Sequence, residues 1–146
     1  MIAVSACDAR PPRPDPAAVA EPPPPAAPGS TLTYDALIAL VAEEDDFAKA
    51  RKLGALLPTL GPESLPAVKE ALAEAAALEM NAVEFELLLR YWTMHDTKGA
   101  AHYALGKAPN AYSVAAIRSA VVPWVKADPE QSLVTLRRYR GAKGDT

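Results

Sequence analysis

The sequence holds one cysteine and has neither a CxxC pair nor a cluster of cysteine and histidine residues. A single cysteine cannot form an internal disulfide bond, and without such a cluster the usual zinc ligands are missing. Walker, GxGxxG, GxSxG and HExxH motifs are absent as well. The sequence therefore predicts no enzyme, no cofactor and no metal site.

A large net charge is also absent. The formal net charge of -3 is too small to indicate nucleic acid as a partner. Hydrophobic residues make up 50% of the 146 residues, which is enough to bury one modest core. One domain with an appended arm is the organisation we expect.

Residues 1–30 contain no Leu, Phe, Tyr or Trp but hold nine of the 15 prolines. They have little apolar surface with which to offset the entropy of ordering, so they are predicted to be disordered. A polyproline II segment rises about 3.1 Å per residue, so the stretch from Asp8 to Ser30 could reach on the order of 70 Å. We expect a Pro/Ala-rich tether at 1–30 and a folded domain at 31–146.

The cysteine stands directly before this tether, in the tetrapeptide Val4-Ser5-Ala6-Cys7. The tetrapeptide resembles the lipobox of bacterial lipoproteins, in which small residues precede the cysteine that is lipidated. The resemblance implies cleavage between Ala6 and Cys7, and acylation of Cys7 would then anchor the protein to a membrane of the cell envelope.

A signal peptide also needs a basic region and an apolar stretch, and Met1 to Ala3 supply neither. The lipoprotein hypothesis therefore expects a start upstream of Met1, so that the first residues are the remnant of a longer signal. If Met1 is the true start, the alternative is a soluble cytoplasmic protein with a plain linker.

Composition changes at Thr31, and a repeat of 32 residues follows. Trp92 and Trp124 are 32 residues apart, and each is followed four residues later by an aspartate, Asp96 or Asp128. The same offset of 32 residues aligns Leu60 with Trp92 and Ser64 with Asp96. Three degenerate units emerge.

Each unit reads as a helical hairpin. Its apolar residues fall at helical spacing, and Ser64, Asp96 and Asp128 each stand where a side-chain oxygen can cap the next helix. Asn81 with Glu84 resembles a capping box. We predict helices near 34–43, 46–60, 63–78, 82–95, 97–107, 111–126 and 129–139. The predicted fold is all-α, a short α-solenoid of about three stacked hairpins plus an N-terminal helix.

The architecture resembles tetratricopeptide and HEAT repeats in general design, without the full signature of either. The Trp92 and Trp124 units look more like the Trp-x3-Asp-Pro helical repeats found in proteins of high-GC bacteria. That family has no activity to carry over to this chain.

Several residues have both a functional and a structural interpretation. Trp92 and Trp124 could line a ligand groove, but their matching places in the apolar stripe favour core anchors, with Leu60 as the third. A metal site at His95, Asp96 and His102 is disfavoured, because Asp96 starts a new helix and separates the two histidines.

Proline and charge patterns are interpreted structurally. Pro123 should remove the backbone bond to the Ser119 carbonyl and kink its helix, and Pro58 stands in a similar place. The acidic run 43–46 should cap the second helix rather than hold calcium. Arg137, Arg138, Arg140 and Lys143 form a basic C-terminus, read as a solvated helix end, with anionic lipid headgroups as the alternative.

The function we expect is an envelope lipoprotein whose helical repeats serve as a non-catalytic adaptor or scaffold for an unknown protein or peptide. Weak self-association through an uncapped terminal repeat is also expected. The alternatives are a soluble cytoplasmic interaction module and, third, a helical hydrolase with a site that no motif indicates. An exposed apolar groove beside Tyr91, Tyr103 or Tyr112 would favour binding, whereas a uniformly charged surface would weaken that hypothesis.

Overall fold

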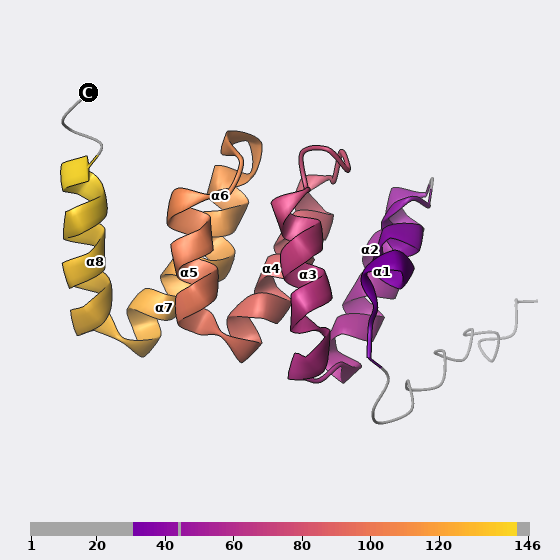
Figure 1. The fold of residues 1–146 in the computed structure, drawn as a ribbon, viewed down its shortest axis with the longest axis horizontal. Helices are drawn as coiled ribbons and strands as arrows, with labels where there is room; N and C mark the ends of the chain where they lie inside the picture. Colours follow the sequence, from indigo (N-terminus) through magenta and orange to yellow (C-terminus); the bar gives the residue numbers. More distant parts are fainter. Residues whose placement is uncertain (1–30, 44, 143–146) are drawn as a thin grey trace, which may run out of the picture.

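The computed structural model describes residues 31–43 and 45–142, and these ranges contain no β-strand. The helices stand side by side in a row, with α1 and α8 at opposite ends (Figure 1). The predicted disordered arm, Cys7 and Lys143 lie outside the described residues. The helices are α1 Tyr34–Val41, α2 Asp46–Leu56, α3 Leu65–Ala73, α4 Ala82–His95, α5 Thr97–Gly106, α6 Ser113–Ala116, α7 Val122–Ala127 and α8 Pro129–Ala142.

The predicted fold class is confirmed: the domain is a short all-α solenoid. In chain order, α1 is followed by three antiparallel pairs, α2 with α3, α4 with α5, and α6–α7 with α8. In Figure 1, α3 and α5 lie in front of α4 and α6. Helix α1 packs on α3 and α2 packs on α4, so the helices form two layers.

Helix α4 lies at the centre of the core. Its residues Phe85, Leu88 and Leu89 have no exposed surface, because both layers pack on it. The Phe85 ring stacks on Tyr112 with centroids 4.4 Å apart. Asn81 and Glu84 form the predicted capping box, which fixes where this helix begins.

Tyrosine hydroxyls connect each hairpin to the preceding one. Tyr103 donates to the Leu72 carbonyl at 2.6 Å, and Tyr112 donates to the Met80 carbonyl at 2.6 Å. Tyr91 donates to the Gly61 carbonyl in the same way. Each acceptor stands 30 to 32 residues before its donor, close to the repeat period. The acceptors lie at helix ends and turns, and the Gly61 and Leu72 carbonyls also accept a local backbone N–H.

The helix predicted at 63–78 is shorter than expected. A 3₁₀ turn, Pro62–Ser64, precedes α3, which ends at Ala73, and the chain then leaves the helix through Glu79, whose φ is 49°. This turn brings Met80, which is 4% exposed, into the core. Burial of Met80 competes with continuation of the helix, and helical spacing alone does not reveal that competition.

The helix type changes beside both prolines, at which the sequence predicted kinks. Pro58 lies in a 3₁₀ turn, Leu57–Thr59, that follows α2. Before Pro123, the chain forms a π-helical turn, Ile117–Val121. The Ser119 carbonyl, which Pro123 cannot use as an acceptor, instead accepts the Thr93 hydroxyl at 3.0 Å. A side chain from α4 therefore replaces the missing backbone donor.

Candidate functional site

The Trp-x3-Asp motif of the second unit forms one hydrogen-bonded cluster. The Trp92 indole Nε1 donates to Asp96 Oδ2 at 3.3 Å, while the Gly99 backbone N–H donates to Asp96 Oδ1 at 2.9 Å. Asp96 thus caps α5 and also fixes the orientation of the buried Trp92 side chain. The spacing of four residues is what lets one carboxylate serve both groups.

The positive charge of Lys69 completes this cluster. Lys69 Nζ lies 3.5 Å from Asp96 Oδ2 and 4.8 Å from the centre of the Trp92 ring. The hydrogen bond from the Gly99 N–H, aided by Trp92 and Lys69, lowers the pKa of Asp96 against the opposing effect of its partial burial. The carboxylate therefore stays ionised when the domain is folded.

The other predicted anchors are buried too. Trp124 is 2% exposed and Leu60 is 6% exposed. The backbone N–H of Gln131 donates to Asp128 Oδ1 at 3.1 Å, so Asp128 has the position of a cap at the start of α8.

The prediction that Ser64 caps a helix is wrong. Its side chain makes no capping bond to α3, and its Oγ instead accepts the Leu32 backbone N–H at 2.9 Å. Ser64 is fully buried, so its hydroxyl serves the segment before α1 rather than its own helix. Leu32 and Ser64 are themselves 32 residues apart, so this bond joins the segments that precede α1 and α3.

The two histidines face different aromatic rings. His95 lies edge-on to Tyr91 with ring centroids 4.6 Å apart, and His102 lies 5.7 Å from the Trp124 ring. Within the described ranges, no group of three His, Cys, Asp or Glu side chains is placed to hold a metal ion.

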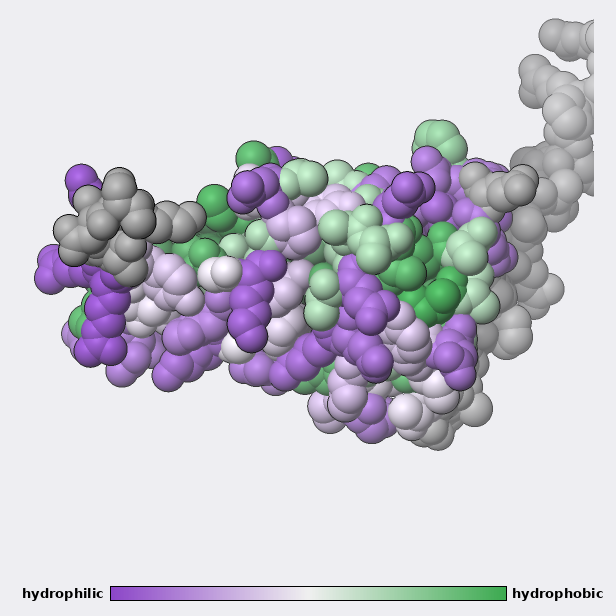
Figure 2. Space-filling model, turned by 45° about the horizontal axis from the view of Figure 1, so that its top comes forward, coloured by the Kyte–Doolittle hydropathy of each residue, from purple (hydrophilic) through white to green (hydrophobic). Residues whose placement is uncertain are grey.

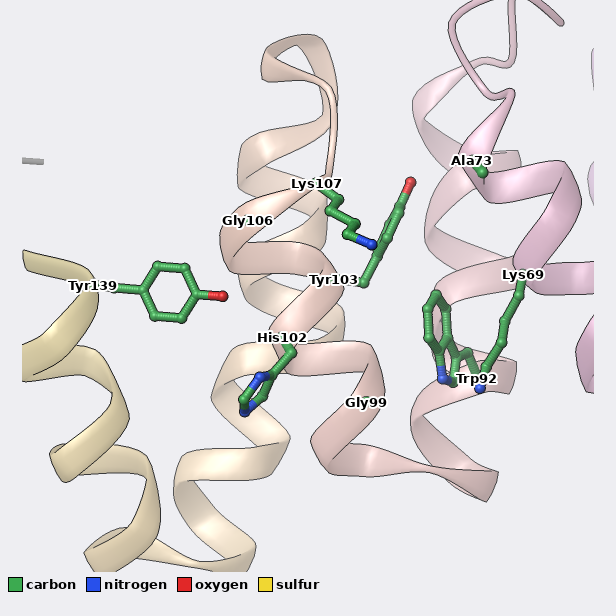
Figure 3. Close-up of a pocket in the computed structure, with 9 residues that line it drawn as sticks. All are labelled: Lys69, Ala73, Trp92, Gly99, His102, Tyr103, Gly106, Lys107 and Tyr139. Atoms are coloured by element: carbon green, nitrogen blue, oxygen red, sulfur yellow. The ribbon is translucent and has the colours of Figure 1, made fainter. Parts of the chain in front are cut away.

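A groove of about 760 Å³ runs across α5 between α3 and α8. Figure 3 shows Tyr139 of α8 pointing toward α5 from one side, and Lys69 lying against Trp92 on the other. Tyr103, one of the three tyrosines named in the sequence analysis, borders the groove. The lining residues are Lys69, Ala73, Trp92, Gly99, His102, Tyr103, Gly106, Lys107 and Tyr139.

Two glycines make the floor of the groove. Gly99 and Gly106 are seven residues apart on α5, so they lie on the same side of the helix, two turns apart. A Cβ atom at Gly106 would stand 3.1 Å from the Tyr139 hydroxyl, and one at Gly99 would stand 2.0 Å from Asp96 Oδ2. The absence of both side chains keeps the groove open and leaves space for the Asp96 carboxylate.

A buried ion pair was not predicted from the sequence. Lys49 Nζ lies 2.8 Å from Glu84 Oε1, and the Glu84 side chain is completely buried. Hydrogen bonds to Glu84 and then to Asp46 raise the pKa of Lys49. The pair joins α2 to α4, and the capping box that positions Glu84 was the one signal of it in the sequence.

Asp45 of the acidic run and the arginines of α8 lie as predicted. Asp45 accepts the Phe47 N–H at 2.9 Å and so caps α2. Arg137, Arg138 and Arg140 lie exposed on α8. On the face shown in Figure 2, hydrophilic residues are frequent at the C-terminal end and hydrophobic residues gather towards the N-terminal end.

No protein-family model, curated protein or solved structure matches this chain. Among the residues that the structure describes, no helix is both long enough and apolar enough to cross a bilayer.

Gly99→Ala should destabilise the domain, although alanine is normally the better helix former. The new Cβ would displace the Asp96 carboxylate, so the cap and the bond to Trp92 would both be lost. Loss of a cap typically costs about 1 kcal/mol. Urea unfolding followed by circular dichroism measures the change.

Gly54→Ala is the matched control, because a Cβ at this position in α2 meets no atom within 4 Å. This change should leave stability unchanged or raise it by about 0.5–1 kcal/mol. Equal effects of the two substitutions would contradict the role given to Gly99.

Acid should weaken the domain partly through Asp96. Its pKa lies below the ordinary 3.8 in the folded state, so its stabilisation is complete above that pH and disappears as the pH falls through the lowered value. Asp96→Asn should therefore lower the melting temperature at pH 7 and have a smaller effect at about pH 2.5. A difference from the parent protein that is the same at both pH values would contradict this account.

Proposed function

We propose that this protein is a non-catalytic adaptor whose helical repeats bind a segment of a partner protein in the groove across α5. The groove of about 760 Å³ is the observation that supports the proposal most strongly. Solenoids commonly bind partners on the extended surfaces that their stacked repeats create.

The lining of the groove suits a peptide. Tyr139 is partly exposed and offers aromatic surface, beside the edges of Trp92 and Tyr103, which are each 8% exposed, and such residues are favoured at protein interfaces. Gly106 is exposed and carries no side chain, so a peptide can approach the backbone of α5 beside the Tyr139 hydroxyl.

The polar groups of the groove favour particular contacts. Lys69, His102 and Lys107 can donate hydrogen bonds to the carbonyl groups of an extended peptide, while the aromatic rings contact its apolar side chains. The partner segment that fits best is an extended one with at least one large apolar residue.

The envelope location remains part of this proposal and rests on Val4-Ser5-Ala6-Cys7 alone. Mass spectrometry of the protein from its native membranes is the test. A diacylglyceryl thioether on Cys7 would support anchoring, whereas a soluble, unmodified chain that begins at Met1 would refute it.

Peptide selection tests the groove directly. Peptides selected from a random display library on the full chain should bind with dissociation constants of about 1–100 µM. Gly106→Leu should weaken this binding about tenfold or more, because the new side chain fills the floor of the groove beside Tyr139.

Gly54→Leu serves as the control, since it adds the same side chain to an exposed helical position away from the groove. It should leave peptide binding unchanged. Selected peptides that bind both variants equally well, or the absence of any selected peptide, would contradict the proposal.

A further inference from the structure

A second hollow lies on the other layer of the stack, between α4 and the segment formed by the π-helical turn and α7. Its volume is about 520 Å³, and it shares no lining residue with the groove across α5. Its lining includes Arg90, Thr93, Met94, Arg118, Ser119 and Pro123.

Two arginines give this hollow its charge. Arg90 lies 3.0 Å from Glu86 Oε1, and Arg118 lies 4.0 Å from Glu86 Oε2, so one carboxylate is shared between two guanidinium groups. The arginine side chains are 60% and 64% exposed, and each guanidinium has five N–H donors. The trio carries a net charge of about +1, which suits a single carboxylate better than a phosphate dianion.

Ser119 supplies an independent indication of a ligand. The residue is 3% exposed, and its Oγ is buried without a hydrogen-bond partner. A buried hydroxyl without a partner costs free energy, and such groups are rare in folded proteins. Ser119 belongs to the lining of the same hollow, so an acceptor group of a ligand could satisfy this hydroxyl once the side chain turns toward the hollow.

The neighbouring threonines do not compete for this role. Thr93 Oγ1 donates to the Leu89 and Ser119 carbonyls, and Thr97 Oγ1 donates to the Thr93 carbonyl. Their hydroxyl protons are therefore already used. Arg90, Arg118 and Ser119 remain as the donors that can bind an incoming anion.

Apolar surface adjoins the charged hollow. Met94 is 71% exposed and borders both this hollow and a smaller one of about 150 Å³. The smaller hollow is lined by Leu57, Pro58 and Leu87, among others, and Arg90 borders it as well. Flexible methionine side chains adapt readily to a partner surface.

We propose that this face is a second binding site, which takes an acidic amphipathic segment of a partner protein. One carboxylate of the segment would bind Arg90, Arg118 and the Ser119 hydroxyl, and an apolar side chain would pack on Met94 and enter the smaller hollow. The site is separate from the groove of the proposed function, so each layer of the stack would hold its own partner.

A fluorescein-labelled peptide with the sequence (Glu-Glu-Leu-Leu)₄ is the probe, and fluorescence anisotropy with the full chain is the measurement. The peptide should bind with a dissociation constant below about 100 µM. Arg90→Gln and Arg118→Gln should each weaken binding about tenfold. Arg137→Gln is the matched control, because it removes an exposed arginine of α8, and it should leave binding unchanged.

Ser119→Ala separates a binding role from a structural one. Since the hydroxyl lacks a partner in the free protein, its removal should leave the melting temperature unchanged or raise it. The same change should weaken peptide binding about threefold or more. Loss of stability without loss of binding would overturn the role given to Ser119 in the proposal.

Three results would overturn the site itself. The first is no binding at a peptide concentration of about 1 mM, and the second is equal weakening by Arg137→Gln, which would indicate general charge attraction. The third is displacement of the peptide by inorganic phosphate at about 5 mM, which would indicate a phosphate site. If Gly106→Leu weakened binding of the acidic peptide and Arg90→Gln did not, the peptide would lie in the groove across α5. That result would contradict this proposal and support the proposed function.

Discussion

The hydrogen bonds from tyrosine hydroxyls to backbone carbonyls of the preceding hairpin hold this stack in register. Tyr91, Tyr103 and Tyr112 each reach back by about one repeat, to backbone carbonyls at helix ends and turns. Burial raises the pKa of Tyr103 to about 12, so its hydroxyl remains a donor at neutral pH. The bond from Tyr103 joins α5 to α3, and both of these helices contribute residues to the groove.

The cluster of Trp92, Asp96 and Gly99 connects the core to the surface. Asp96 Oδ2 accepts the indole N–H of a core residue, and Oδ1 accepts the N–H of Gly99, the third residue of the helix that carries the groove. The glycine that makes room for the carboxylate also forms part of the groove floor. Stability and the shape of the groove therefore depend on the same three residues.

Helical spacing, the Trp-x3-Asp period and the prolines were enough to predict the all-α solenoid, the capping box at Asn81 and the interruption at Pro123. They did not predict the early end of α3, because it follows from burial of Met80 among residues distant in the sequence. Nor did they predict the role of Ser64, because its hydroxyl accepts the N–H of Leu32, 32 residues earlier. The groove could not be predicted either, because its lining comes partly from α3, α5 and α8, which are distant in the sequence.

Urea unfolding of Tyr112→Phe tests the role of the tyrosine bonds most directly. Phenylalanine keeps the stack on Phe85 but leaves the buried Met80 carbonyl without its hydroxyl donor. The account predicts a loss of about 1–3 kcal/mol, with little change for Tyr139→Phe, whose ring is only partly buried. A loss for Tyr112→Phe no larger than that for Tyr139→Phe would contradict it.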